Sequence, residues 1–239
     1  YNPNNAVLVI AGAVSVDKAK QLTQKWFGDI PSGNTPTRRL PKEPVQQKLE
    51  RRIRQSNVPV DALYLAFHTP SRMDPDFYAV DLLSDILSNG TSSRLYRRLL
   101  KEQNLFSQID AYLTGNIDPG LLIIEGRPTK GVSLEKAAEA IWQELNLLKE
   151  APIPVHELQK WKNQVESTLV FSETNVLNKA INLAFFEVLG EAELINREKE
   201  LYQAVTAEDI HRVAQNILID SNCSELHYTA ASGEVDKLN

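Results

Sequence analysis

The stretch from Asp74 to Asn89 constrains this chain most, because it combines a helix start, an apolar stripe and a helix stop. Asp74 can cap a helix, and Pro75 fits the first helical position, where its missing N–H is not needed. Apolar residues then recur at helical spacing: Phe77, Val80, Leu83, Ile86 and Leu87. Asn89 and Gly90 tolerate the positive φ of a helix C-terminus. The pattern predicts an amphipathic helix with one buried face.

The next residues predict a second helix and then a β-hairpin. Ser92 or Ser93 can open the helix. Its apolar positions are Leu95, Leu99 and Leu100, and those of the strand after it are Ile109, Ala111 and Leu113. A turn over 116–120 leads into a second apolar run at 121–127, and so short a connection requires antiparallel strands.

Strand and helix patterns are separated along the rest of the chain. Residues 47–53 predict a polar edge strand, 61–69 a central strand and 224–230 the last strand. A helical stripe begins at Ser133 and stops before Pro152 and Pro154. The next helix is predicted from the stripe Leu158, Trp161, Val165 and Leu169, and further helices over 174–189, 192–203 and 206–218. Thr206 with Asp209 resembles a capping box at the start of the last one. This order indicates an α+β fold: a mostly antiparallel sheet with a block of helices on one face.

The sequence pattern predicts that the N-terminal residues form a separate segment. Residues 6–11 are a strand-like apolar run, and Ser15 can cap a helix that Gly28 closes. Residues 31–46 are rich in proline and lack periodicity, which is typical of an extended linker. We therefore predict a strand and helix left from a preceding domain at 1–30, a linker at 31–46, a main domain at 47–232 and a tail at 233–239.

Composition excludes several classes of protein. The 239 residues carry a net charge of −5. This argues against nucleic-acid binding, since the densest basic groups, Arg38-Arg39 and Arg51-Arg52-x-Arg54, have acidic neighbours. No apolar run approaches the roughly 20 residues of a membrane-spanning helix. The single cysteine, Cys223, rules out an internal disulfide framework but does not fix the compartment.

The residues of a catalytic or metal centre are missing from the sequence. The four histidines, His68, His156, His211 and His227, are too far apart for two of them to share a helical turn. Neither His-x-x-Glu-His nor Gly-x-Ser-x-Gly occurs. Cys223 has no basic neighbour and is interpreted as a structural thiol. We predict no catalytic, cofactor-binding or metal-ligating residue here, and no activity of this portion alone.

Three stretches in the right order resemble the zinc metallopeptidases of the pitrilysin and mitochondrial processing peptidase family (M16). They are YNPNNAVLVIAGAVSVDKAKQLTQKWFGDI at 1–30, NGTSSRLY at 89–96 and VTAEDIHRVAQNIL at 205–218. The likeness covers nearly the whole chain and is greatest to the bacterial branch with two domains per chain. It implies that 1–30 ends the N-terminal domain and that the remainder is the C-terminal, non-catalytic domain.

The resemblance also implies two site positions. In the family this domain contributes an Arg and, seven positions later, a Tyr, which bind the substrate backbone across a cavity from the zinc. Setting SSRLYRRL against the family's Ser-Arg-Leu-Tyr-x-x-Leu-Arg-Glu-x-x-Gly-Leu-x-Tyr pattern places these roles at Leu100 and Ser107, and both residues are substituted. Lys101 stands one position along, but lysine cannot reproduce the planar fork of arginine.

The resemblance implies a function for the parent protein rather than for this portion. Our first hypothesis is the non-catalytic portion of a zinc-dependent metalloendopeptidase subunit, which forms part of a chamber wall and docks a partner. Zinc would be held upstream. Implied partners are the N-terminal catalytic domain, a homologous subunit in a homo- or heterodimer, and a peptide substrate. The alternative is a non-proteolytic binding or assembly subunit, which would lack His-x-x-Glu-His upstream of Tyr1. A periplasmic or cell-envelope location is favoured over a cytoplasmic one.

Overall fold

The computed structural model describes residues 2–34 and 41–231. These residues form two units, each considered by itself. One joins 2–34 and 41–44 to 163–201, and the other joins 45–162 to 202–231. The predicted main domain, 47–232, contains nearly all of the second unit together with 163–201, and its boundaries stay a prediction. Most of the predicted linker, but not 35–40, is described, whereas the predicted tail at 233–239 lies outside the described residues.

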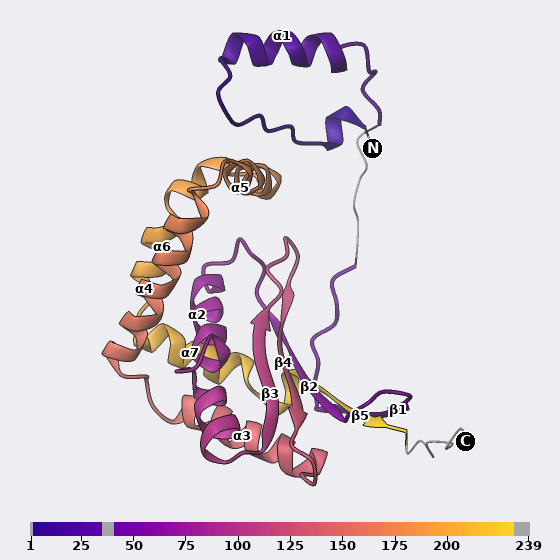
Figure 1. Cartoon of the computed structure of the whole chain (residues 1–239), viewed down its shortest axis with the longest axis vertical. Helices are drawn as coiled ribbons and strands as arrows, with labels where there is room; N and C mark the ends of the chain where they lie inside the picture. Colours follow the sequence, from indigo (N-terminus) through magenta and orange to yellow (C-terminus); the bar gives the residue numbers. More distant parts are fainter. Residues whose placement is uncertain (1, 35–40, 232–239) are drawn as a thin grey trace, which may run out of the picture. The chain divides into compact units, whose positions relative to one another are not determined.

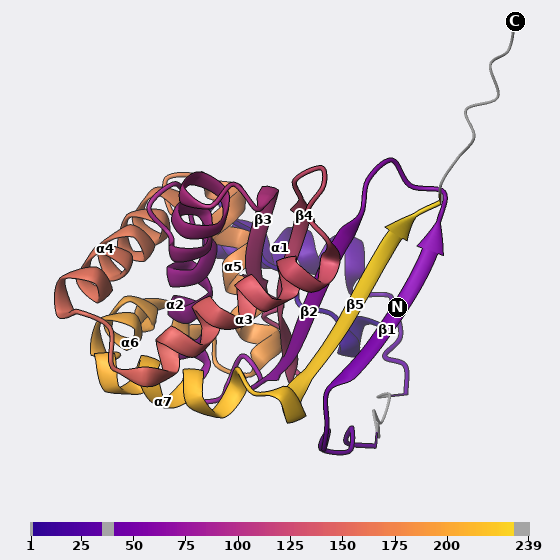
Figure 2. The same cartoon turned by 90° about the horizontal axis from the view of Figure 1, so that it is seen from below.

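A mixed sheet forms the centre of the second unit (Figure 2). Its strands are β1 (Glu50–Ser56), β2 (Ala62–Thr69), β3 (Phe106–Leu113), β4 (Gly120–Pro128) and β5 (Cys223–Ala230). Their order is β1-β5-β2-β4-β3, and every pairing is antiparallel except that of β1 with β5. The α+β class and the mostly antiparallel sheet are confirmed. The polar edge strand β1, the central strand β2 and the β3–β4 hairpin also form as the sequence predicts.

Helices cover one face of this sheet (Figures 1 and 2). They are α2 (Phe77–Ser88), α3 (Leu134–Glu150) and α7 (Ala207–Ile217). α2 packs on β3, while α3 and α7 pack on β2 and on each other. The core between the layers consists of fully or almost fully buried apolar side chains, among them Leu63, Leu65, Phe67, Val80, Leu83, Leu122, Ile124, Ile141, Leu145 and Val213. Burial of this apolar surface is the main stabilising contribution to the unit.

The start of α2 differs from the prediction by two residues. The helix begins at Phe77, and the Asp74 carboxylate accepts a hydrogen bond from the Asp76 N–H at 2.9 Å. Asp74 therefore caps the turn that leads into the helix. The predicted stop is confirmed, because α2 ends at Ser88 and Gly90 has a φ of 85°. Only glycine adopts this backbone conformation without strain.

The second helix of the 74–113 stretch is largely π-helical. This segment, η2 (Tyr96–Glu102), follows a turn in which the Ser93 hydroxyl donates to the Gly90 carbonyl at 2.7 Å. Leu95 and Leu99 are fully buried. The sequence predicts helix here but not its winding, and π-helical turns are rare and frequently lie at functional sites.

The remaining helices follow the predicted breaks. α4 (Val155–Ser172) begins after Pro152 and Pro154 and continues from one unit into the other. Thr206 and Asp209 form the predicted capping box of α7, with hydrogen bonds in both directions. The other helical segments are α5 (Val176–Leu189), η3 (Ala192–Asn196), α6 (Glu198–Ala204) and η4 (Asp220–Asn222).

One prediction for the N-terminal piece is correct and one is wrong. The helix α1 (Val16–Phe27) forms, and the Ser15 hydroxyl accepts from the Lys18 N–H as its cap. Residues 6–11 do not form the predicted strand, and the only other element in this region is η1 (Pro3–Asn5). A strand requires a neighbour for its backbone N–H and C=O groups, and no described strand pairs with these residues. Apolar side chains such as Trp26 remain exposed.

Candidate functional site

The structure places the two substituted family positions on consecutive elements. Leu100 lies in η2 and is half-buried, whereas Ser107 is exposed on β3 and its hydroxyl donates to the Arg127 carbonyl at 3.0 Å. Phe106, the residue before Ser107, is almost fully buried, and a register shift follows it in β3. The Lys101 ammonium lies 5.5 Å from the centre of the Tyr96 ring. Neither Leu100 nor Ser107 carries a side chain that can reach a peptide backbone as Arg and Tyr would.

Ser107 is exposed at a register shift of β3, next to the open face of the sheet, which is the face away from α2, α3 and α7. Elsewhere side chains alternate along each strand, so the register identifies the members of this face. They are Arg52 and Arg54 of β1, Tyr64 and Ala66 of β2, Asp110 and Tyr112 of β3, Ile123, Glu125 and Arg127 of β4, and Leu226 and Tyr228 of β5. The open face thus mixes aromatic and aliphatic groups with charges, which suits an extended polypeptide better than a compact apolar ligand.

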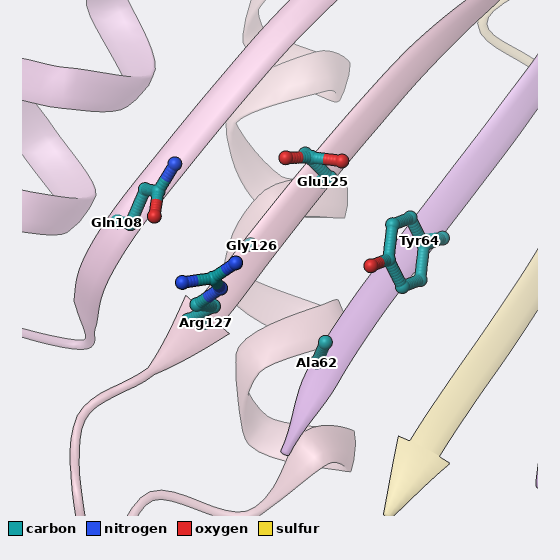
Figure 3. A pocket seen from close by; sticks show the side chains of 6 residues that line it. All are labelled: Ala62, Tyr64, Gln108, Glu125, Gly126 and Arg127. Atoms are coloured by element: carbon teal, nitrogen blue, oxygen red, sulfur yellow. The ribbon is translucent and has the colours of Figure 1, made fainter. Parts of the chain in front are cut away.

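The open face has a small hollow over strands β2, β3 and β4 (Figure 3). It is lined by Ala62, Tyr64, Gln108, Glu125, Gly126 and Arg127. In Figure 3 the Tyr64, Glu125 and Arg127 side chains stand in front of strands β2 and β4, with helices behind the sheet. Its volume of about 10 Å³ accommodates one water molecule. The hollow is therefore too small for an organic ligand.

Carboxylates give the open face a negative centre. Asp110 and Glu125 are directly opposite each other on β3 and β4, and the Gln108 amide donates to Asp110 at 2.9 Å. Partial burial raises the pKa of the neighbouring Tyr112, and the charge of Glu125 adds to this effect. Tyr112 therefore keeps its proton as a hydrogen-bond donor at neutral pH. These groups can bind and orient a polar chain, but they supply no activated nucleophile.

The four histidines do not meet. His68 lies in β2, His156 is exposed at the start of α4, and the His211 Nε2 is 2.9 Å from the Lys149 carbonyl oxygen in the α3–α7 contact. In residues 2–34 and 41–231, no three His, Cys, Asp or Glu side chains lie close enough to hold a metal ion. Burial raises the pKa of Cys223 to about 12, which leaves its thiol protonated and unreactive. The described side chains do not fit a zinc site.

The sequence reasoning missed one cluster of charged residues, on the covered face. Glu225 and His227 are 1% and 2% exposed, and the Glu225 carboxylate lies 2.5 Å from the His227 Nε2. The Arg51 Nε approaches the same carboxylate oxygen at 2.8 Å and joins edge strand β1 to β5. The sequence does show that Glu225 and His227 share one face of β5, because they alternate with Leu226 and Tyr228. A period of two residues alone does not tell which of the two pairs faces the helices.

The fold defines an α+β domain with a covered face that holds the core and an open face on the other side of the sheet. The chain belongs to the family described as the peptidase M16 inactive domain, whose model matches residues 1–165. Among the described residues, no helix is long and apolar enough to cross a bilayer.

Known proteins resemble the chain over most of its length. It is 25% identical to an uncharacterized zinc protease, YmxG, of Bacillus subtilis over 92% of this chain and 53% of that protein. It is also 25% identical to the zinc protease PqqE of Helicobacter pylori, over 92% of this chain and 50% of that protein. The crystal structure of a protease from Helicobacter pylori matches with a TM-score of 0.85 at 22% identity, over 92% of this chain and 53% of that one. The chain spans about half the length of the curated relatives it matches.

Proposed function

We propose that this chain is the non-catalytic portion of a zinc-dependent metalloendopeptidase subunit, whose open face forms part of the wall around a bound peptide. The observation that carries the proposal is membership of the inactive-domain family by a chain whose described residues gather no metal ligands. Relatives about twice as long are zinc proteases by name. Zinc and the general base would then be held by the N-terminal catalytic domain of the same protein.

The substitutions at Leu100 and Ser107 support dependence on a partner. Arg to Leu removes five N–H donors and a charge, and Tyr to Ser shortens the side chain by a ring. The open face keeps Tyr64, Tyr112, Glu125 and Arg127 for peptide contact, but positions 100 and 107 supply neither a guanidinium nor a phenol. Firm binding of the substrate backbone would come from a homologous subunit that carries the Arg and Tyr. A periplasmic or cell-envelope location remains part of this proposal.

Peptidase activity of the full-length protein tests the proposal. We expect weak hydrolysis of an unstructured peptide by the full-length protein alone, and a rise of at least about tenfold when the homologous subunit is added. The double variant Leu100→Arg/Ser107→Tyr should reduce this dependence. Leu100→Gln/Ser107→Thr, which restores neither group, is the matched control.

Two results would contradict the proposal. Full activity of the protein alone, unchanged by substitutions at 100 and 107, would exclude the division of labour between subunits. Absence of bound zinc and of hydrolysis, with and without the second subunit, would favour the alternative of a non-proteolytic binding or assembly subunit.

A further inference from the structure

A cavity distinct from the open face collects most of the basic residues around η2. Its volume is about 460 Å³, and it lies between η2, α3 and the first turns of α4. The lining residues are Ser92, Arg94, Arg97, Arg98, Glu144, Leu147, His156, Glu157 and Lys160. We call it the basic cavity. Arg94, Arg97 and Arg98 are close together in the sequence, whereas Glu144, Glu157 and Lys160 join them only in the folded chain.

Two of the arginines are held in place by glutamates that are part of the same wall. Arg94 donates from Nε and Nη2 to the two oxygens of Glu157 at 2.9 and 2.8 Å. Arg98 donates from Nη1 to Glu144 at 3.1 Å, and the Glu144 side chain is only 5% exposed. A guanidinium has five N–H donors. These pairs therefore fix the orientation of both arginines and leave further donors for a ligand.

The other two cations stand at the mouth of the cavity. The Arg97 side chain is 58% exposed, and its ion pair with Glu102 is long, at 3.7 Å. The Lys160 ammonium donates to the Ser92 hydroxyl at 3.0 Å and lies 3.8 Å from the centre of the Trp161 ring. Burial lowers the pKa of Lys160, the negative charge of Glu157 raises it, and the positive charge of Arg97 has a smaller, lowering effect. The two exposed cations thus have only partial charge compensation from Glu157 and Glu102, and an anion between them would add to it.

Charge balance singles out the basic cavity from the rest of the chain. Its wall has four cationic and two anionic side chains, which leaves a net charge of +2 when His156 is neutral, whereas the whole chain carries −5. Arg94 and Arg98 keep N–H donors that Glu157 and Glu144 do not take, and such guanidinium donors suit the oxygens of further carboxylates. A volume of this size accommodates more than a single small ion.

We propose that the basic cavity binds the acidic side chains of an extended peptide, with Arg97 and Lys160 as the principal contacts. Its assignment to a peptide rests on the proposed function, because a chamber wall meets polypeptides. The cavity would select for Asp- and Glu-containing segments and hold them at a place separate from the bond that is cleaved.

Binding to full-length protein with its metal removed tests this inference independently of hydrolysis. Fluorescence anisotropy would compare a labelled decapeptide that contains four Glu residues with the same peptide in which Gln replaces Glu. We expect the acidic peptide to bind at least about tenfold more tightly, with an affinity that falls as salt increases. The double variant Arg97→Gln/Lys160→Gln should abolish this preference, and Lys130→Gln/Lys136→Gln makes the same charge change at exposed sites elsewhere.

The outcomes separate this inference from the proposed function. Loss of preference in Arg97→Gln/Lys160→Gln but not in Lys130→Gln/Lys136→Gln, with an unchanged thermal midpoint in both, supports the cavity even if no peptidase activity is ever found. Equal loss in both variants would mean that only net charge matters, and would overturn it. Inorganic pyrophosphate that binds the cavity while the acidic peptide does not would also overturn it, in favour of a phosphate site.

Discussion

The two faces of the sheet differ in how much their side chains contribute to the stability of the fold. On the covered face, Phe67 is fully buried and packs edge-to-face on Trp142, with ring centres 5.6 Å apart. On the open face, Ile123 occupies the same sheet but is only half-buried and touches no helix layer. The covered face therefore holds the fold together, and the open face is free to vary with function. Matched substitutions on the two faces test this difference in their contribution to stability.

Removal of a large core side chain should give the largest effect. Phe67→Ala on the covered face should lower the free energy of unfolding by about 3–5 kcal/mol, because it leaves a cavity against Trp142. Ile123→Ala on the open face should cost only about 1 kcal/mol or less. Urea unfolding followed by circular dichroism measures both. Equal losses would show that the open face is packed in the full-length protein against another part of it.

Loss of a buried carboxylate should have the next largest effect. Glu225→Gln weakens the contacts to His227 and Arg51 and places an amide N–H₂ among buried groups. It should therefore cost about 1–3 kcal/mol. Glu125→Gln on the open face should change stability by about 0.5 kcal/mol or less, since it removes a charge opposite Asp110. The same denaturant titration applies, and a larger loss for Glu125→Gln would reverse our assignment of the two faces.

A smaller, pH-dependent effect should come from α2 on the covered side. Burial, and then the charge of Asp81, raise the pKa of Asp85 to about 6 from its ordinary 3.8. The folded state therefore binds more protons than the unfolded state between these values. The ionised Asp85 carboxylate therefore destabilises the folded state fully above pH 6. This destabilisation disappears as the pH falls from 6 to 4, because the carboxylate becomes protonated. Asp85→Asn should raise the thermal midpoint at pH 8 by a few degrees and have little effect near pH 4.

The pKa of Asp76, which precedes the first residue of α2, is shifted in the opposite direction. Its carboxylate receives two hydrogen bonds from Arg212, both 2.7 Å, and these lower its pKa. Its stabilising contribution is present above the ordinary pKa and is lost as the pH falls through the lowered value. Asp76→Asn should thus lower the thermal midpoint at pH 8. Shifts of the same sign for both variants would mean that burial does not govern Asp85.

Local sequence signals predicted the elements that depend on local physics. Caps at Ser15 and Thr206, the breaks at Pro152 and Pro154 and the stop at Gly90 all appear in the structure, because each acts within one helical turn. The strand predicted at 6–11 failed for the opposite reason. Apolar character makes a strand favourable only when a second strand pairs with it, and none of the described strands does.

The candidate sites depend on contacts that sequence cannot show. The roles proposed for Leu100 and Ser107 come from the resemblance to the family and stay a prediction. The basic cavity was not predicted, because Arg97 and Lys160 come from elements far apart in the chain. The buried Glu225–His227 pair was not predicted either, since a strand of period two has equivalent faces until a layer of helices covers one of them.

The sequence by itself determined the α+β class, the helix boundaries set by caps and prolines, the hairpin of β3 and β4, and the absence of a paired-histidine motif. These follow from short-range stereochemistry and from the residue types present. Only the tertiary structure decided that β1 pairs in parallel with β5, which face of each strand is buried, and that four cations from separate helical segments share one cavity. Those features depend on long-range packing, in which the energy of a residue is set by neighbours that the local sequence does not contain.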